Sequence, residues 1–94
     1  MITSRWNLLS DELKVAVKIQ ELNKAKKHPY FSLLIDLFKG EMSHSTVHAV
    51  LRRLIDKGTI SADWIKVENK WVRKYYIAGE ITDFIDMLIA EIYE

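Results

Sequence analysis

The chain has no cysteine, a single proline and three glycines among its 94 residues. Without cysteine it forms no disulfide, offers no thiolate to a metal and has no cysteine nucleophile, and an intracellular location fits best. No apolar run approaches the ~18 to 20 residues of a membrane span. The first residues also lack the basic start and long apolar stretch of a signal peptide. We expect a soluble, cytoplasmic protein that does not enter a membrane.

Sequence motifs for catalysis and for metal binding are missing as well. There is no Gly-x-Ser-x-Gly, no phosphate-binding glycine loop and no Ser-His-Asp arrangement recognisable by spacing. His44 and His48 are four residues apart, but no glutamate of a zinc-protease motif lies between them. A metal site would need carboxylates such as Asp36 or Glu41. We expect no enzyme activity, no bound metal and no cofactor.

The composition that remains is that of a folded protein, with 49% hydrophobic and 29% charged residues. At this length we expect a single domain, residues 1–94. Residues 1–79 hold all 14 lysines and arginines against eight acids, whereas residues 80–94 hold five acids and no Lys or Arg. A basic body with a separate acidic end suits nucleic-acid binding, although the net charge is only +1.

Apolar spacing and capping residues predict four helices. Ser10 is suited to cap a helix over 10–26, and Pro29 suits the first turn of a helix over 29–39. Gly40 stands where a left-handed residue ends that second helix. The two remaining helices are expected over 43–57, between Ser43 and Gly58, and over 80–93.

Residues 59–77 are rich in β-branched and aromatic residues, which favour strands. They predict strands over 63–67 and 71–77, joined by Glu68, Asn69 and Lys70 into a hairpin over 63–77. Aromatic residues of this hairpin could stack on unpaired bases. We instead expect them to pack in the core or across the hairpin: Trp64, Trp71, Tyr75 and Tyr76.

The predicted fold class is therefore mainly α with a small β-hairpin (α+β). Two helices joined by a short turn that contains Gly40 form a helix-turn-helix, whose second helix, 43–57, enters the DNA major groove as the recognition helix. The hairpin 63–77 is the wing, and the helix over 80–93 follows it. The same fold can present its surface to another polypeptide, so a protein–protein interaction module without DNA binding is the alternative.

Turning the apolar positions of 43–57 inward leaves its small and polar residues outside, where they can approach base edges. Arg52 or Arg53 can bond guanine in a bidentate manner, and the wing cations suit phosphate, although strand lysines also discourage edge pairing. Asp56 would repel phosphate, so we expect it outside the footprint. The expected DNA-binding residues are Ser45, Thr46, His48, Arg52, Arg53, Lys66, Lys70, Arg73 and Lys74.

The segment Ser43-His-Ser-Thr-Val-His-Ala-Val-Leu-Arg-Arg-Leu-Ile-Asp-Lys-Gly-Thr-Ile resembles the recognition helix and following turn of winged helix-turn-helix regulators of the PadR, MarR and ArsR groups. His28-Pro29-Tyr30 and Arg73-Lys74-Tyr75-Tyr76-Ile77 are similar to the PadR pattern in particular. The chain departs from that pattern at Val47, His48 and Ala78. The resemblance implies a three-helix core with a two-stranded wing, and a dimeric, repressor-like transcriptional regulator of double-stranded DNA whose terminal helix serves dimerisation.

The helix over 80–93 carries an apolar stripe from Ile81 to Ile92 that must pack on something, because large apolar side chains are unfavourable in water. Against the helix over 10–26 of the same chain it would complete a monomer, and against a second subunit it would form a two-fold interface, which we expect. The apolar residues of 10–26 cover more than half of the helical wheel, which implies two packing partners. A pocket between these helices could hold a small-molecule effector, which nothing in the sequence identifies. We expect the outer face of the terminal helix, Asp83, Asp86, Glu91 and Glu94, to point away from DNA. The expected homodimer interface comprises Leu13, Val17, Ile81, Phe84, Ile85, Leu88, Ile89 and Ile92.

Overall fold

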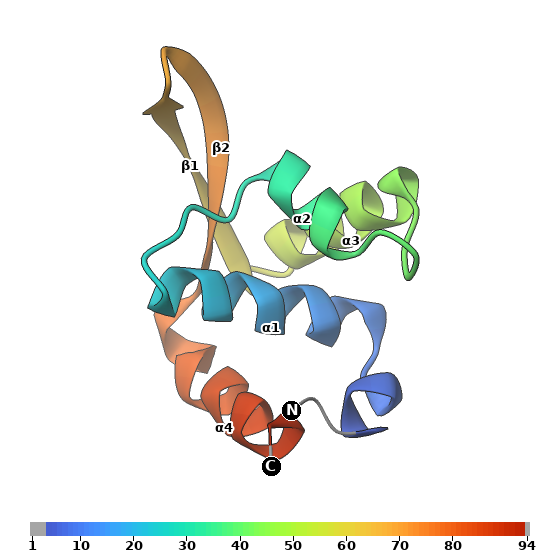
Figure 1. Ribbon diagram of the computed structural model, residues 1–94. Helices are drawn as coiled ribbons and strands as arrows, with labels where there is room; N and C mark the ends of the chain where they lie inside the picture. The colour runs from blue at the N-terminus through green and yellow to red at the C-terminus, as the bar shows by residue number, and fades with distance from the viewer. Residues whose placement is uncertain (1–3, 94) are drawn as a thin grey trace.

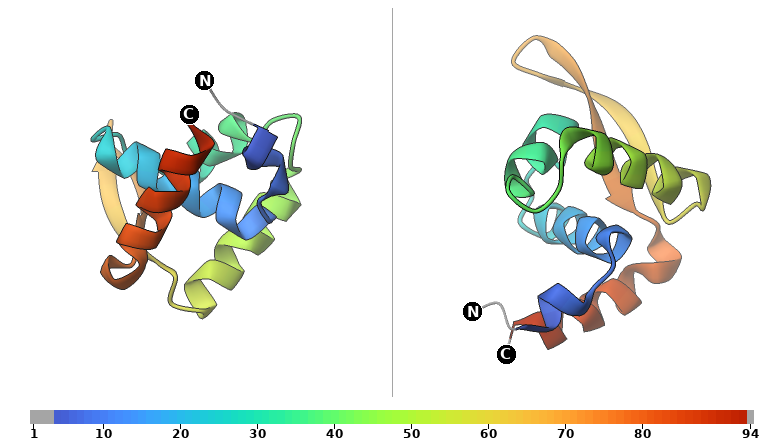
Figure 2. Two further views of the ribbon diagram at one scale, coloured as in Figure 1. Left: turned by 90° about the horizontal axis from the view of Figure 1, so that it is seen from below. Right: turned by 90° about the vertical axis from the view of Figure 1, so that its right-hand side faces the viewer.

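The helices form a layered body from which one hairpin projects (Figure 1). The computed structural model describes residues 4–93. Figure 1 shows α1 in the middle, α4 on one side of it, and α2 and α3 on the other. The hairpin and α4 lie at opposite ends of the molecule, as a second direction of view confirms (Figure 2). The elements are η1 (Ser4–Leu8), α1 (Asp11–Lys24), α2 (Phe31–Leu37), α3 (His44–Asp56), β1 (Ile60–Val67), β2 (Lys70–Ile77), η2 (Gly79–Ile81) and α4 (Thr82–Ile92).

The first long helix, α1, is the centre of the core. Ser10 caps it as expected, because the Ser10 Oγ accepts a hydrogen bond of 3.2 Å from the Leu13 amide. The helix contacts α3, β2 and α4, and a run of its residues is buried, including the polar Gln20. The wide apolar arc is therefore covered by other elements of the same chain. The width of this arc is one reason to expect a dimer. The structure shows that the arc needs no second subunit to cover it.

The start of α2 differs from the sequence prediction. The helix begins at Phe31 rather than at Pro29, because the preceding residues are extended along the hairpin. The Pro29 carbonyl accepts a hydrogen bond of 2.9 Å from the Tyr75 amide, and Tyr30 forms a β-bridge with Lys74. Because Pro29 lies outside the helix, its carbonyl is free to make this contact. The segment before α2 thus anchors the base of the hairpin.

The turn between α2 and α3 is held by the N-terminal segment, to which the sequence assigned no element. Trp6 is buried, stacks on Phe38 and donates from its Nε1 to the Glu41 carboxylate, 3.2 Å away. Lys14 forms a salt bridge with the same carboxylate at 3.3 Å. Gly40 has a φ of 92°, the left-handed conformation that its position predicts. These contacts fix the helix-turn-helix against α1.

Helix α3 ends as its sequence predicts. Gly58 has a φ of 74°, its amide donates to the Ile55 carbonyl, and the next amide, from Thr59, donates to Leu54. This pair of hydrogen bonds is a Schellman motif, which satisfies carbonyls that the helix end would otherwise leave free. The motif directs the chain from α3 into β1.

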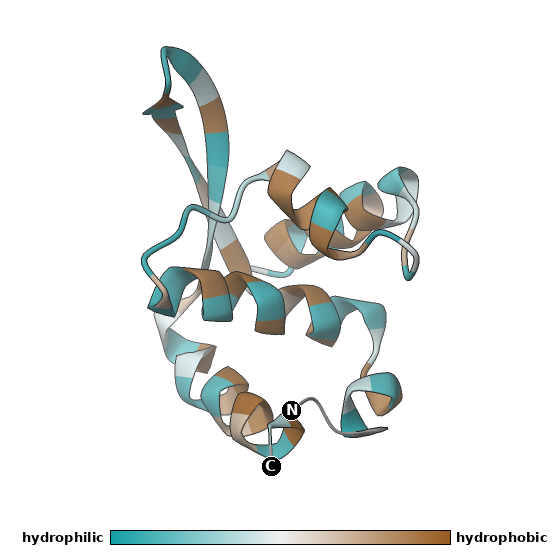
Figure 3. Ribbon diagram, in the orientation of Figure 1, coloured by the Kyte–Doolittle hydropathy of each residue, from teal (hydrophilic) through white to brown (hydrophobic). Residues whose placement is uncertain are grey.

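The hairpin is longer and tighter than predicted. β1 begins at Ile60 instead of residue 63, and Lys70 belongs to β2 rather than to the connection. Glu68 and Asn69 alone make the turn, with φ of 50° and 66°, values typical of a type I′ turn. The two strands pair antiparallel from Ile60↔Ile77 to Val67↔Lys70 without a bulge. Figure 3 shows that the tip is hydrophilic.

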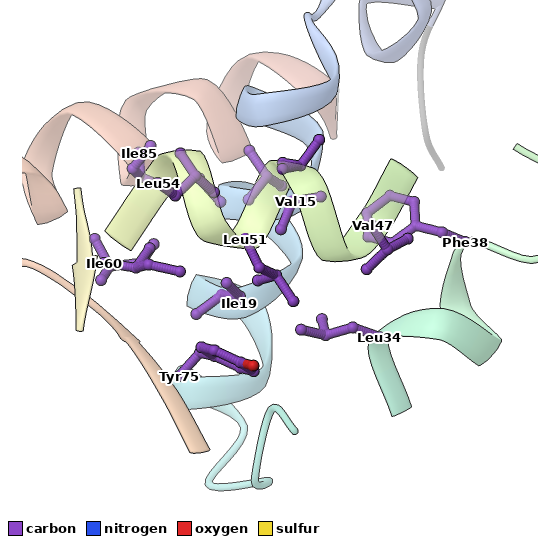
Figure 4. Packing of buried hydrophobic residues seen from close by; sticks show 14 of the residues in the cluster. Val15, Ile19, Leu34, Phe38, Val47, Leu51, Leu54, Ile60, Tyr75 and Ile85 are labelled. Atoms are coloured by element: carbon purple, nitrogen blue, oxygen red, sulfur yellow. The ribbon is translucent and has the colours of Figure 1, made fainter. Parts of the chain in front are cut away.

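The hydrophobic core lies between α1, α3, α2 and the base of the hairpin (Figure 4). Its members include Ile19, Leu34, Leu51 and Ile60, all nearly inaccessible to solvent. Leu37, whose spacing predicts a core position, is instead 44% exposed. No helix within residues 4–93 is long and apolar enough to cross a membrane.

The last helix contributes to this core from the other side of α1. A short 3-10 turn, η2, occupies the start of the predicted helix, and α4 proper begins at Thr82. Three of the residues that we expected at a dimer interface are buried in the chain's own core and are thus not on its surface: Val17, Ile85 and Ile92. The remaining five are partly buried or exposed: Leu13, Ile81, Phe84, Leu88 and Ile89.

The acidic face of α4 also differs from the prediction. Asp86 faces α1, where it forms a 2.8 Å salt bridge with Lys24 and accepts a 3.0 Å hydrogen bond from Gln20. Hydrogen bonds from these two side chains lower the pKa of the Asp86 carboxyl. Asp83 and Glu91 are exposed, whereas Glu94 lies outside the described residues. Asp86 therefore joins two helices and does not belong to an outer acidic face.

Candidate nucleic-acid interface

The N-terminal end of α3 carries a cluster of hydroxyl groups. The Ser43 Oγ accepts a 3.2 Å hydrogen bond from the Thr46 amide and donates to the Thr46 Oγ1 at 3.0 Å. The Ser45 Oγ lies 3.1 Å from the same Ser43 oxygen. Ser45 is exposed and Thr46 is half-buried. The cap thus holds both expected contact residues in place at the end of the helix that a groove would receive first.

Farther along α3, the exposed face divides into two sides. Ser45 and Arg52, seven residues apart, share its centre, whereas Arg53 lies on the side of Thr46. His48 lies on the other side, toward α2, where its ring meets the edge of Phe31 with centroids 5.9 Å apart. His48, Arg52 and Arg53 are all exposed, as expected.

A hollow of about 250 Å³ separates α3 from the base of β2. His48 and Arg52 line it from the helix, and Arg73 and Tyr75 line it from the strand. Burial raises the pKa of the Tyr75 hydroxyl, so this side chain stays neutral between the cations. Asp56 also lines the hollow, although we expected it away from the contact surface. The structure therefore brings three of the expected contact residues to a common site: His48 and Arg52 from α3, and Arg73 from β2.

The four expected wing cations do not share one face of the hairpin. Side chains alternate between faces along a strand, and the register pairs Trp64 with Arg73 and Lys66 with Trp71. Lys66 and Arg73 thus lie on the face that continues from buried Ile60 and Ile77 at the base. Lys70 and Lys74 lie on the opposite face, where the Lys74 Nζ is 4.9 Å from the Tyr76 ring centroid.

Among the described residues, salt bridges hold some of the cations of the chain but none of those expected to contact DNA. Salt bridges within residues 4–93 hold four lysines, at positions 14, 18, 24 and 57. In that part of the chain, none is formed by any of the six cations that the sequence assigns to DNA: Arg52, Arg53, Lys66, Lys70, Arg73 and Lys74. Their charge is therefore not neutralised by a carboxylate within the described residues, and it is available to an anionic partner.

Two tryptophans of the wing are exposed, contrary to our expectation. Trp64 is 64% exposed and Trp71 65% exposed, although we expected both to be packed. Of the four aromatic residues of the hairpin that we expected to be packed, only Tyr75 is buried. The hairpin register could have indicated this exposure, because strand alternation places both tryptophans on the face of Arg73, beyond the last buried pair.

The two histidines of α3 find no metal-binding neighbours in the structure. Across residues 4–93, no group of three or more His, Asp or Glu side chains is arranged to hold a metal ion. His48 contacts the Phe31 ring instead, and both His44 and His48 are exposed.

The comparisons with known proteins agree with this architecture. No family model matches the sequence, and none of the curated proteins matches it. Among solved structures, the chain is similar to the circadian clock associated protein Pex from Anabaena, with a TM-score of 0.65 and 20% sequence identity. The match covers 88% of this chain and 76% of that one. Together with the order of four helices and a two-stranded antiparallel hairpin, this likeness shows that the chain has a winged-helix fold.

Proposed function

We propose that this protein binds double-stranded DNA sequence-specifically through α3 and the wing, and regulates transcription. One observation carries the proposal: Arg52 of α3 and Arg73 of the hairpin line one hollow, and none of the six cations of these two elements has a carboxylate partner within residues 4–93. Phosphate neutralisation by Lys and Arg supplies much of the affinity of proteins for DNA. Unpaired cations around an exposed, capped helix are the arrangement that such binding requires.

Each part of the interface has a separate role in this proposal. The outer residues of α3, centred on Ser45 and Arg52, face base edges in the major groove, where arginine bonds guanine in a bidentate manner. Lys66 and Arg73, on the wing face nearer α3, contact the flanking backbone. The acidic α4 lies at the far end of the molecule, away from the DNA (Figure 1).

We further propose a homodimer formed through α4. Phe84 is 48% exposed and Met87 is 54% exposed, one turn apart on the same side of the helix, and Leu8 of the adjoining η1 is 84% exposed. Exposed apolar groups of this kind mark interaction surfaces. A two-fold dimer places two recognition helices in successive major grooves about 34 Å apart. The resemblance to PadR regulators favours this arrangement and a repressor role.

Selection from a random duplex pool tests the proposal. We expect an enriched palindrome, whose symmetry reports the dimer. If the dimer neutralises 6 to 10 phosphates, its affinity for that sequence falls about 10³- to 10⁵-fold between 50 and 200 mM salt. A pool without enrichment, together with a flat salt response, would falsify duplex recognition.

Paired variants identify the surface used. Arg52→Ala and Arg53→Ala should weaken binding to the selected duplex while leaving the unfolding midpoint unchanged, because both side chains are exposed. Lys24→Ala is the matched control, since Lys24 is paired with Asp86 at the α4 end. Equal DNA affinity in all three variants would instead support the use of this fold as a protein-interaction module.

A further inference from the structure

A second hollow lies between the hairpin and the start of α2, on the wing face that carries Trp64 and Arg73. Its volume is about 340 Å³, within the range of small-molecule sites, and it is bordered mainly by rings. Arg73 supplies the positive charge at this site. The aromatic residues that line the hollow are Tyr30, Phe31, His48, Trp64, Trp71 and Tyr75.

Among the tyrosine, phenylalanine and tryptophan residues that line this hollow, only the two tryptophans are exposed. Both are about two-thirds exposed, an unfavourable state for side chains of this size in water. Across the strands, Trp64 pairs with Arg73 and Trp71 pairs with Lys66, so indoles and cations alternate on one face. The Arg73 guanidinium lies 5.9 Å from the centroid of the Trp64 ring.

This combination restricts the chemistry of the ligand. Aromatic cages for quaternary ammonium groups use ring faces to attract a cation, but Arg73 and Lys66 would repel one here. A purely apolar peptide would leave both cations without a partner. A single-stranded nucleic acid satisfies both features, because its bases stack on aromatic faces and its phosphates meet the cations.

We propose that the wing hollow stacks unpaired nucleobases of DNA, against Trp64 and Trp71, with Lys66 and Arg73 on the adjoining phosphates. The inference rests on the proposed function in one respect: a base in this hollow belongs to DNA that α3 holds. The preferred substrate is then a duplex with an unpaired or opened stretch beside the recognition site. The wing reads the opened stretch, and α3 reads the duplex.

Tryptophan fluorescence of the full chain tests the stacking directly. The probe is an oligothymidylate of about eight nucleotides, a length within the usual site size of single-strand binding proteins. An abasic deoxyribose-phosphate strand of equal length carries the same charge without bases. We expect the thymidylate to quench Trp64 and Trp71, and the abasic strand to bind at least about tenfold more weakly with little quenching. Trp6 is buried and supplies a constant background.

Variants separate stacking from simple charge attraction. Trp71→Ala should weaken thymidylate binding about tenfold or more, and Trp71→Phe should restore most of it. Leu37→Ala, which removes an exposed apolar side chain from α2, is the control and should change nothing. Equal binding of thymidylate and abasic strand, or unchanged affinity in Trp71→Ala and Trp64→Ala, would overturn the inference.

The outcome does not depend on duplex recognition, because oligothymidylate forms no duplex. A protein that binds its selected blunt duplex but not thymidylate would disprove base stacking and leave the proposed function standing. A protein that binds thymidylate through the tryptophans but selects no duplex would disprove recognition by α3 and leave stacking standing.

Discussion

The two ends of this molecule differ in how their charged groups are partnered. At the α1–α4 end, Lys24 is paired with Asp86, and the Tyr93 hydroxyl donates a 2.9 Å hydrogen bond to Glu21. At the α3–wing end, six cations have no carboxylate partner within residues 4–93 and two tryptophans are exposed. The paired polar groups of the first end stabilise the fold, whereas the cations and tryptophans of the second remain available to a ligand. Function is therefore expected where the chain leaves its own groups unpartnered.

The largest contrast between the two kinds of region should be in stability. Ile19 is fully buried in α1, so Ile19→Ala should lower the free energy of unfolding by about 2–5 kcal/mol, through lost burial and the cavity that remains. Urea denaturation measures this loss. Trp71→Ala is the wing counterpart and should stay within about 0.5 kcal/mol of the parent. A comparable loss in Trp71→Ala would show that the wing tryptophan contributes to the fold.

The two glycine turns give a smaller and cleaner comparison. Gly58, which ends α3, has a φ of 74°, and a Cβ there would meet no atom within 4 Å. Gly58→Ala should therefore cost about 1–2 kcal/mol from the left-handed backbone alone. Gly79, before α4, has equally open space but no positive φ, so Gly79→Ala should be neutral or slightly stabilising. Equal thermal midpoints for the two variants would contradict this assignment of strain.

The charge comparison is testable through the salt dependence of DNA binding. If Lys66 contacts one phosphate, Lys66→Gln should weaken binding to all duplexes alike and reduce the slope of log affinity against log salt by about one. Lys24→Gln, at the paired end, should leave the slope unchanged. Fluorescence anisotropy at several salt concentrations measures both slopes, and equal slopes would remove Lys66 from the interface.

The smallest expected effect is a pH dependence at the α4 end. Desolvation first, then the hydrogen bond to Glu21, raises the pKa of Tyr93 from 10.0 to about 12. Because the folded-state pKa lies above the unfolded one, Tyr93 stabilises the fold fully below pH 10, and this contribution is lost as pH rises toward about 12. Tyr93→Phe should remove that part of the alkaline destabilisation. Ultraviolet titration of tyrosinate measures the shift, and an ordinary pKa would refute it.

The sequence alone determined most of the helical framework and the limits of α3. Ser10 and Ser43 are helix caps, and Gly40 and Gly58 take the predicted left-handed conformation, because capping and backbone preference depend on a few neighbouring residues. The helix-turn-helix, the hairpin and the α+β class followed from such local signals and from apolar spacing. The expected contact residues of α3 are likewise exposed or half-buried. Their roles in binding DNA remain predictions.

Tertiary structure decided the features that depend on contacts between distant segments. Pro29 lies outside α2 because its carbonyl pairs with Tyr75, 46 positions along the chain, and no local preference reports that bond. The strand register separated the wing cations into two faces, and packing on both sides of α1 buried Val17 and Ile85 in the core. Burial is decided by what the rest of the chain covers, and a residue's own type does not specify its neighbours.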